Sequence, residues 1–473
     1  MPGIAHVGFD FGSSLIKVAV RLEDVGEAGA APDSAFGIAF EGESKDGPYR
    51  VFRPTALWIR DDGNGGIIQL RGASAGARAI TGIKERLMGG FHPQGDALLH
   101  SPLGECGLTL LEGAALLLAS TMCDIRDAID AYARDRNTRR PDTVLVNCAV
   151  PSADTMSIQT QDALSQGACP QRRAFQELME RVRRWAFGAA PEGIPGELSF
   201  EQAKKIASCI LGSRLPPEIS EWGTTCIPEA LAAVIAAIRH AEFTDGLFFV
   251  FDVGAYTTDA SLFHFHPAPE YRIMVYYGMG SSRAGIGTAG ADPLPAADAA
   301  ALRRQLEDMY RSMLEHMLET HGALFVRALL KHEPRPNTPK WSAVILGGGA
   351  NSQDVRRMIA GLSLPSASGE GHRVAPTGTE PRRFPVQTYS HVVFIRQRGG
   401  SSRTKPVIGL QTNMPTYVAA LERPSSILQL ALGLSSGVFH VPAWSACEPV
   451  TPTKRPPAVS EDAWRRFHPW SEH

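Results

Sequence analysis

Residues 246–262, GLFFVFDVGAYTTDASL, constrain the fold more than any other stretch of the chain. The apolar run 247–251 stops at Asp252, turns through Gly254 and resumes as an apolar alternation from Ala260, which predicts two strands and a tight turn. The pattern Asp-x-Gly-x-x-Thr-Thr-Asp lines this turn with carboxylates, hydroxyls and backbone amides. Such a turn suits a phosphate chain, because successive N–H groups bind anions and a carboxylate beside them can hold hydrated Mg²⁺ or orient a water. For this stretch alone, an ordinary hairpin with polar turn residues stays open.

The N-terminal residues 5–20, AHVGFDFGSSLIKVAV, repeat the same order. An apolar strand runs into Asp10, is followed by Gly12 and a hydroxyl pair, Ser13 and Ser14, and continues as a second apolar strand. Two copies of one sequence pattern in a single chain are unlikely to arise by chance. The repetition therefore favours a phosphate-binding role over the ordinary hairpin.

Strand, Asp-x-Gly, hydroxyl pair and strand resemble the phosphate hairpins of the actin-like ATPase superfamily. The resemblance implies an α/β fold of two lobes, each with a ribonuclease-H-like mixed β-sheet flanked by helices, and a nucleotide cleft between them. It also implies a third landmark, a strand that ends in a Gly-Gly loop and opens a helix near the adenosine. Residues 343–354, AVILGGGANSQD, match this landmark, with a helix expected to begin at Asn351 or Ser352.

Within this superfamily the chain resembles the heat shock protein 70 (DnaK-like) family. A strand ending Val150-Pro151, the helix start at 229–233 (EALAA) and the hairpin 252–259 follow one another as they do in that family. The resemblance covers about residues 4–437. It implies lobe I at 1–240 with a closing helix at 424–438, lobe II at 241–423, and a Pro-rich tail at 439–473 in place of the peptide-binding domain and lid.

The resemblance implies ATP or ADP and Mg²⁺ as ligands, and it assigns four charged residues to the chemistry. Asp10 would hold the hydration shell of the metal. Asp252 would orient the lytic water and also contact the metal. Glu229 would occupy a hydrated-metal or water position, and Lys84 would be the catalytic lysine, although it lies one residue further from the Arg-Leu-Met-Gly run than the family lysine does.

The remaining residues implied by the resemblance contact the nucleotide through small side chains or backbone. They are Gly12, Ser13, Ser14, Gly254, Tyr256, Thr257, Gly347, Gly348 and Gly349. Two departures from the family affect them. Tyr256 stands where the family has a glycine, so its ring would crowd or cover the site. Gly349 and Asn351 replace a serine and an arginine that packs on adenine, which puts recognition of the base in question.

Hydrophobic periodicity predicts the other elements. Between residues 23 and 150 we expect a loop at 23–47, strand, turn and strand at 49–58, a helical segment at 72–90, a helix at 108–135 and a buried parallel strand at 142–150. Further along we expect helices at 175–187, 200–210 and 226–238, a glycine-rich loop at 278–290, a helical region at 296–331, and short strands at 392–396 and 406–411.

Two short motifs carry a second interpretation. Residues 285–290 match Gly-x-Gly-x-x-Gly, but no strand-helix-strand unit with a downstream acid follows, so a loop over the nucleotide cleft is the preferred interpretation. His264 and His266 alternate along one strand face. They have no third ligand in view, so a packed or surface pair is preferred over a metal site.

Composition limits the location and the partners. The 473 residues are 44% hydrophobic and carry a net charge of −2, so the chain gives no electrostatic reason for binding nucleic acid or an anionic membrane. No apolar run reaches the length of a spanning helix, and the N-terminus lacks a signal-peptide core, which predicts a cytoplasmic protein. The seven scattered cysteines fit reduced core thiols.

Three functions remain open. The first is an ATP-binding, slowly hydrolysing Hsp70-like switch that acts on an unknown protein partner. The second is a pseudo-ATPase interaction scaffold, which the departures at Tyr256, Gly349 and Asn351 favour. The third is a small-molecule kinase or an actin-like filament adaptor, because Asp10 to Ser14 together with Lys17 also resemble the first hairpins of those proteins.

Overall fold

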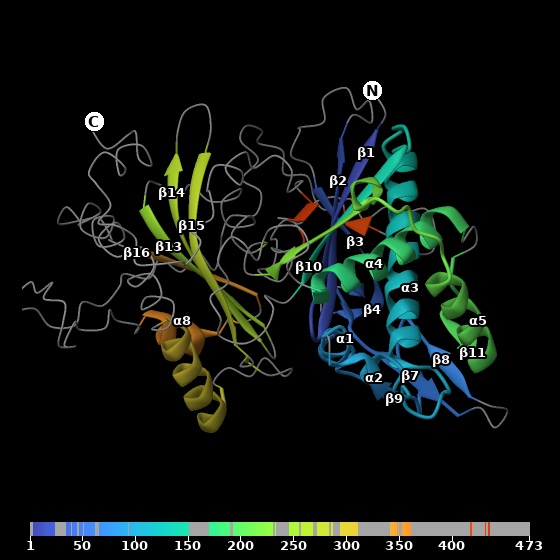
Figure 1. The fold of residues 1–473 in the computed structure, drawn as a ribbon, viewed down its shortest axis with the longest axis horizontal. Coiled ribbons are helices and arrows are strands. Elements are labelled where there is room, and N and C mark those ends of the chain that lie inside the picture. The colour runs from blue at the N-terminus through green and yellow to red at the C-terminus, as the bar shows by residue number, and fades with distance from the viewer. Residues whose placement is uncertain are drawn as a thin grey trace, which may run out of the picture.

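The computed structural model describes more than half of the chain and places two separate groups of strands in it (Figure 1). The described residues are 3–23, 35–38, 40–44, 47–50, 52–61, 66–92, 94–150, 170–189, 193–229, 232, 246–254, 257–267, 272–282, 285–286, 294–310, 341–347, 349, 352–360, 417–418, 431 and 434–435. The protein is of the mixed α/β class, with mixed sheets flanked by helices.

The first sheet has β1 (Ile4–Phe11) near its centre and the order β12-β10-β1-β2-β3-β17. β2 (Leu15–Glu23) runs antiparallel to β1, and β10 (Thr143–Val150) runs parallel to it. β12 (Thr224–Pro228) continues the parallel side. β3 (Ala35–Ile38), β17 (Tyr417–Val418) and β6 (Phe52–Pro54), which also pairs with β2, complete the sheet.

The second sheet has the order β15-β14-β13-β16. β13 (Gly246–Val253) pairs antiparallel with β14 (Thr258–Pro267) and parallel with β16 (Trp341–Leu346). β15 (Arg272–Ser282) pairs antiparallel with β14. Both sheets therefore contain a hairpin whose first strand has a later parallel strand on its other side. The two halves of the chain repeat one topology.

A smaller sheet and a separate strand pair lie in the first half of the chain. The smaller sheet has the order β11-β8-β7-β9 and consists of β7 (Leu57–Arg60), β8 (Ile67–Gln69), β9 (Arg78–Ile80) and β11 (Glu197–Ser199). β4 (Phe40–Ser44) pairs with β5 (Gly47–Arg50).

The helices of the first half are α1 (Ile83–Gly90), α2 (Asp96–Leu99), α3 (Leu110–Asp135), α4 (Pro170–Arg184) and α5 (Phe200–Leu211). α4 continues as a π-helical turn, Trp185–Ala189, and a 3-10 turn spans Ile219–Glu221. In the second half, residues 296–310 are helical and α8 spans Gln353–Ala360.

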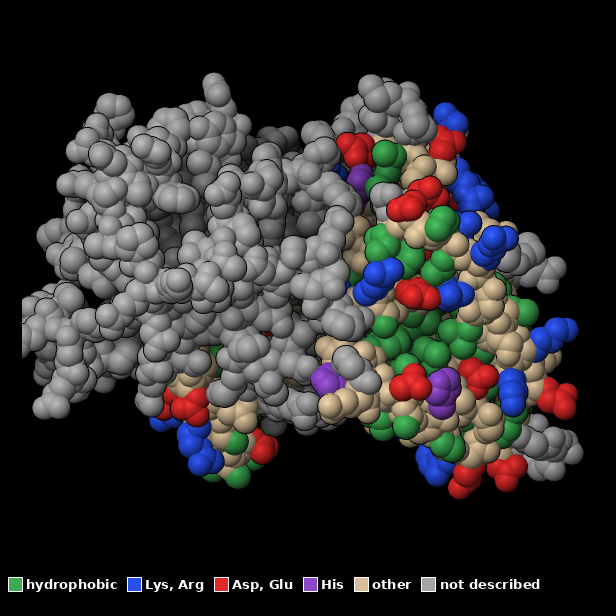
Figure 2. Space-filling model, in the orientation of Figure 1, with side chains coloured by type: hydrophobic (Ala, Val, Ile, Leu, Met, Phe, Trp, Pro, Cys, Tyr) green, Lys and Arg blue, Asp and Glu red, His purple; other side chains and the backbone are tan. Residues whose placement is uncertain are grey.

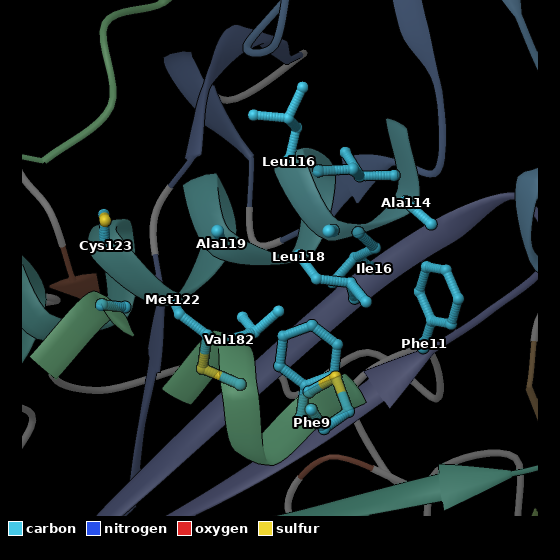
Figure 3. Packing of buried hydrophobic residues seen from close by; sticks show 14 of the residues in the cluster. Phe9, Phe11, Ile16, Ala114, Leu116, Leu118, Ala119, Met122, Cys123 and Val182 are labelled. Carbon is cyan, nitrogen blue, oxygen red and sulfur yellow. The ribbon is translucent and has the colours of Figure 1, made fainter. Parts of the chain in front are cut away.

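The core of the first half lies between β1, β2 and the helices α3 and α4 (Figure 3). Phe9, Phe11 and Ile16 point from the strands toward α3, and the ring of Phe11 stacks on Phe175 of α4 with centroids 5.7 Å apart. α3 begins where expected, because Thr109 and Glu112 form a reciprocal capping box that satisfies its first backbone N–H groups. Because Phe9 and Phe11 face the helices, His6, Gly8 and Asp10 lie on the opposite face of β1, which is also buried.

Four element predictions need correction. The expected loop at 23–47 contains β3 and the start of a strand pair, because Phe36 is buried and its ring stacks on Tyr132 of α3. The expected helix at 72–90 begins only at Ile83, since Gly76 and Gly82 have positive φ and residues 78–80 pair with β7.

The other two corrections concern segments that begin as strands, one paired with a remote strand and one with its neighbour in sequence. The expected helix at 226–238 begins as β12, where Cys226 pairs with Cys148 of β10. The expected glycine-rich loop at 278–290 begins as strand, because β15 continues to Ser282, which pairs with Thr258 of β14. The expected strands at 392–396 and 406–411, the tail at 439–473 and most of the helix at 424–438 lie outside the described residues.

Candidate nucleotide site

The two hairpin turns share one geometry. In the first, the Gly12 N–H donates to the Leu15 carbonyl over 3.1 Å, and in the second the Gly254 N–H donates to the Thr257 carbonyl over 2.8 Å. Each turn therefore has four residues, and each has an aspartate two residues before its glycine. Asp10 and Asp252 are the equivalent positions.

Thr55 fastens the first turn from outside the hairpin. Its hydroxyl donates to the Gly12 carbonyl over 2.6 Å, and its N–H donates to the Ser14 carbonyl over 2.8 Å. The Ser14 hydroxyl oxygen is buried and has no hydrogen-bond partner among the described residues. A polar atom in this state is an available ligand donor, because burial without a partner is costly. Nothing in the local sequence pointed to Thr55.

Asp10 is buried at the end of β1, and its carboxylate accepts a hydrogen bond from the ammonium of Lys17, with Oδ2 and Nζ 2.6 Å apart. The two residues are direct cross-strand neighbours. The sequence assigned Asp10 to the metal and gave Lys17 no role of its own.

Lys84 of α1 and Glu229, which follows β12, form a buried ion pair. Burial alone would lower the pKa of Lys84, but attraction to the Glu229 carboxylate, with smaller contributions from Asp10 and Asp259, raises the pKa above its usual value. The lysine is therefore held as a cation. The structure brings together two residues that are 145 positions apart in the chain.

Asp252 of β13 belongs to the second half of the chain, and charged groups of the first half act on it. Burial raises its pKa to about 7, the nearby Lys17 opposes this, and Asp10 and Glu229 raise it further. A carboxyl group with a pKa close to neutral can hold or release a proton under physiological conditions. The sequence-predicted residues Asp10, Lys84, Glu229 and Asp252 thus lie near enough to influence one another's charge.

Asp259 is a site residue that the sequence analysis did not assign. It is buried, it lies directly opposite Asp252 in the β13–β14 register, and its charge acts on Lys84. The sequence could have indicated Asp259, because it is the last residue of the Asp-x-Gly-x-x-Thr-Thr-Asp pattern. Residues that flank a four-residue hairpin loop at equal distances face each other across the two strands.

The third landmark lies beside Asp252. β16 runs parallel to β13, ends at Leu346, and leads through Gly347 to Ser352, whose hydroxyl accepts a hydrogen bond from the N–H of Val355 in the first turn of α8. Gly347 has a φ of 72°, and a Cβ at this position would overlap the Asp252 carboxylate. A Cβ at Gly349 would overlap Val253. Glycine is therefore required where this loop crosses the second hairpin.

The structure places the remaining predicted residues only in part. Ser13 lies in the first turn and Thr257 in the second, each half-buried. Tyr256, Gly348 and Asn351 lie outside the described residues. The Ile286 N–H donates to the Gly254 carbonyl over 3.0 Å, so part of the Gly-x-Gly-x-x-Gly stretch contacts the second turn, as expected of a loop over this site.

The donor set fits Mg²⁺ bound with a phosphate better than a metal held by protein alone. Within the described residues, no group of three or more His, Cys, Asp and Glu side chains is arranged to hold a metal ion. Mg²⁺ usually keeps several waters and takes one or two carboxylates plus phosphate oxygens. Asp10 and Asp252, the free Ser14 hydroxyl and the glycine turns supply these elements.

Comparisons with known proteins give no assignment. No family model matches the chain, and no curated protein matches it. Among the helices that the structure describes, none is long and apolar enough to cross a membrane.

Proposed function

We propose that this protein binds Mg²⁺-ATP with its phosphates between the two hairpin turns, hydrolyses it slowly, and acts as an Hsp70-like, actin-fold switch on a partner protein. One observation carries the proposal. Asp252 of the second hairpin lies within electrostatic reach of Asp10, Lys17, Lys84 and Glu229, all from the first half of the chain. A site assembled from two repeated hairpins is what the actin-like architecture requires.

The repeated topology supports two lobes, with residues 1–240 and the helix at 424–438 in lobe I and residues 241–423 in lobe II. Residues 431 and 434–435 are helical and buried. The Asn147 side-chain amide of β10 donates to the Leu434 carbonyl over 2.9 Å, as expected if this segment returns to lobe I.

Each residue has a role that its surroundings support. Asp252 would accept a proton from the attacking water, because its pKa of about 7 is near the operating pH. Lys84, held as a cation by Glu229, would neutralise charge on the transferring phosphoryl group. The backbone at Gly12, Gly254, Gly347 and Gly349 would approach the phosphates closely. Mg²⁺, when bound near Asp10, would neutralise phosphate charge and align the oxygens.

The partner is proposed to be a protein, reached through rotation of one lobe against the other. Basic and acidic side chains are interspersed on the visible face of the first half, with no extended area of one sign (Figure 2). The five described cysteines are free thiols, which supports a reducing, cytoplasmic location.

Calorimetric titration tests binding. Purified protein is titrated with ATP, ADP and a non-hydrolysable analogue, each with and without Mg²⁺, and phosphate release is then measured on the same sample. The proposal expects binding that strengthens with Mg²⁺, followed by measurable release. Lack of any nucleotide binding would refute it.

The variant Asp252→Asn tests the chemistry. It should bind ATP nearly as well as the native protein and lower turnover by roughly a hundredfold or more, the range for loss of a positioned acid–base group. Asp298→Asn is the matched control, because Asp298 is exposed in the helical residues 296–310 and far in sequence from either hairpin. Unchanged turnover in Asp252→Asn would remove Asp252 from the mechanism.

A nucleotide-responsive scaffold without turnover is the second candidate. The Asp10–Lys17 ion pair favours it, because Asp10 is already neutralised by a cation of the chain. Binding of ATP and ADP with equal affinity and no phosphate release would support this function over the switch.

A further inference from the structure

Lys17 makes the first hairpin differ from the second. Its Nζ lies 2.6 Å from Asp10 Oδ2, and the two side chains are only 16% and 4% exposed. In the second hairpin the equivalent position is Asp259, opposite Asp252. The first hairpin therefore carries a balanced pair, whereas the second carries two carboxylates.

The position of the Lys17 ammonium is central to the site. A Cβ at Gly12 would lie 3.3 Å from Nζ, which places the ammonium beside the first turn. Lys17 is also the first among the charged groups that act on Asp252 of the second hairpin. The ammonium thus lies where it can interact with both aspartates and with an anion bound at the Gly12 turn.

We propose that Lys17 is a tethered counter-ion, which occupies Asp10 in the absence of metal and must leave it before Mg²⁺ binds there. This inference rests on the proposed nucleotide site. The hydrogen bond from Lys17 takes up Oδ2 of Asp10, one of the two carboxylate oxygens that a metal-bound water could use. A divalent ion at Asp10 and an ammonium in the same place also repel each other.

The displaced ammonium has a second partner when a phosphate is present. Rotation about the flexible lysine stem carries it from Asp10 to an anion at the adjacent turn, where a charge-assisted hydrogen bond replaces the one lost. Lys17 therefore opposes metal binding but favours phosphate binding. These opposite effects distinguish a counter-ion from a residue that only supports the fold.

The test measures both effects with simple probes at pH 8. Native protein, Lys17→Met and Lys17→Arg are titrated calorimetrically with MgCl₂ alone, and separately with pyrophosphate in the presence of EDTA. Lys17→Met should bind Mg²⁺ about tenfold more tightly or better, because a nearby like charge is removed. It should bind pyrophosphate at least about fivefold more weakly, because a charge-assisted hydrogen bond is lost.

The controls separate charge from folding. Lys17→Arg keeps the cation and should keep weak Mg²⁺ binding. Lys204→Met removes an exposed lysine of α5 and should change neither affinity. Thermal melting of each variant establishes that it is folded.

Unchanged or weaker Mg²⁺ binding in a folded Lys17→Met variant overturns the inference, and so does unchanged pyrophosphate binding. Failure of the proposed function has a different result, in which native protein and all variants bind no ATP in the presence of Mg²⁺. The MgCl₂ titration tests Lys17 in either case.

Discussion

The surroundings of Asp252 set the pKa of its carboxyl group, and this pKa decides what chemistry the residue can perform. An aspartate in water has a pKa of about 4, whereas burial and the neighbouring carboxylates raise that of Asp252 to about 7. Between these values the folded protein keeps a proton that the unfolded chain has lost. The contribution of Asp252 to the free energy of unfolding therefore falls as the pH rises from about 4 to about 7, and above that range it stays constant.

The first prediction follows from this sign. Asp252→Asn should be more stable than the native protein by an amount that grows between pH 5 and pH 8, reaching roughly 1 to 4 kcal/mol, since each unit of pKa shift corresponds to about 1.4 kcal/mol. Melting temperatures at pH 5, 6, 7 and 8 measure it. For Asp298→Asn, the difference in melting temperature from the native protein should not change with pH. The same lack of pH dependence for Asp252→Asn would contradict the prediction.

The buried pair Lys84–Glu229 leads to a second prediction. Lys84→Met leaves a carboxylate buried without its cation and should destabilise the protein by roughly 3 to 5 kcal/mol. The double variant Lys84→Met/Glu229→Gln should recover most of this loss, because neither charge remains. Denaturation of the native protein, the single variants Lys84→Met and Glu229→Gln, and the double variant gives the coupling energy.

The exposed pair Arg78–Glu105 is the matched comparison for this cycle. Its atoms are 3.8 Å apart and its side chains are 59% and 88% exposed, so the coupling should be close to zero. A coupling for Lys84 and Glu229 as small as that of the exposed pair would show that the buried contact is not formed.

The loop between β16 and α8 is the element most tightly fitted to the site. Gly347 and Gly76 both have positive φ, but only Gly347 has neighbours where a Cβ would stand. Gly347→Ala and Gly76→Ala should therefore share a conformational penalty of roughly 1 kcal/mol. Gly347→Ala should in addition displace Asp252 and weaken ATP binding more than tenfold.

Thermal melting and calorimetry distinguish these two effects. The prediction is wrong if Gly347→Ala and Gly76→Ala lose the same stability and keep the same affinity for ATP, because the overlap with Asp252 would then have no consequence.

Elements with a long apolar pattern were predicted well, whether their partners are near or remote in sequence. Both hairpins, α3 and the parallel strand β10 follow from periodicity, because each carries its own apolar pattern and turn or cap residues. β3, β9 and β12 were missed. Each has a short or mixed pattern and is a strand because of the strand beside it, which is β2 for β3, β7 for β9 and β10 for β12.

The site divides in the same way. Asp10, Asp252 and the three glycine turns were visible as local motifs. Lys84 and Glu229 were assigned to the site only by a resemblance, and their ion pair was not predicted. The contacts of Thr55 and Lys17 depend on which strand lies beside which. Such contacts become visible only once the sheet register is known.

At the scale of the whole molecule, a segment from late in the chain packs against β1 and closes over its face. A Cβ at Gly8 would overlap the Ala431 carbonyl oxygen and approach Ser435, so only glycine admits this segment against β1. Gly8→Ala should loosen residues 431–435 and lower the melting temperature by about 1 °C for each kcal/mol of stability lost, as expected for a chain of this length.

Hydrogen exchange of peptides that contain Ala431 and Leu434 measures this loosening directly. Gly72→Ala is the matched control, because a Cβ at Gly72 meets nothing within 4 Å. Equal exchange in the two variants would mean that the contact at Gly8 does not hold the segment.

This closure has a consequence for biosynthesis. β1 and β2 leave the ribosome early, but β17 and the residues that cover Gly8 are translated about 400 positions later, which takes roughly 20 to 80 seconds at 5 to 20 residues per second. Through that interval the strand that carries Asp10 has one face uncovered. We expect the nascent chain to depend on a ribosome-associated holdase until residues 431–435 have been made.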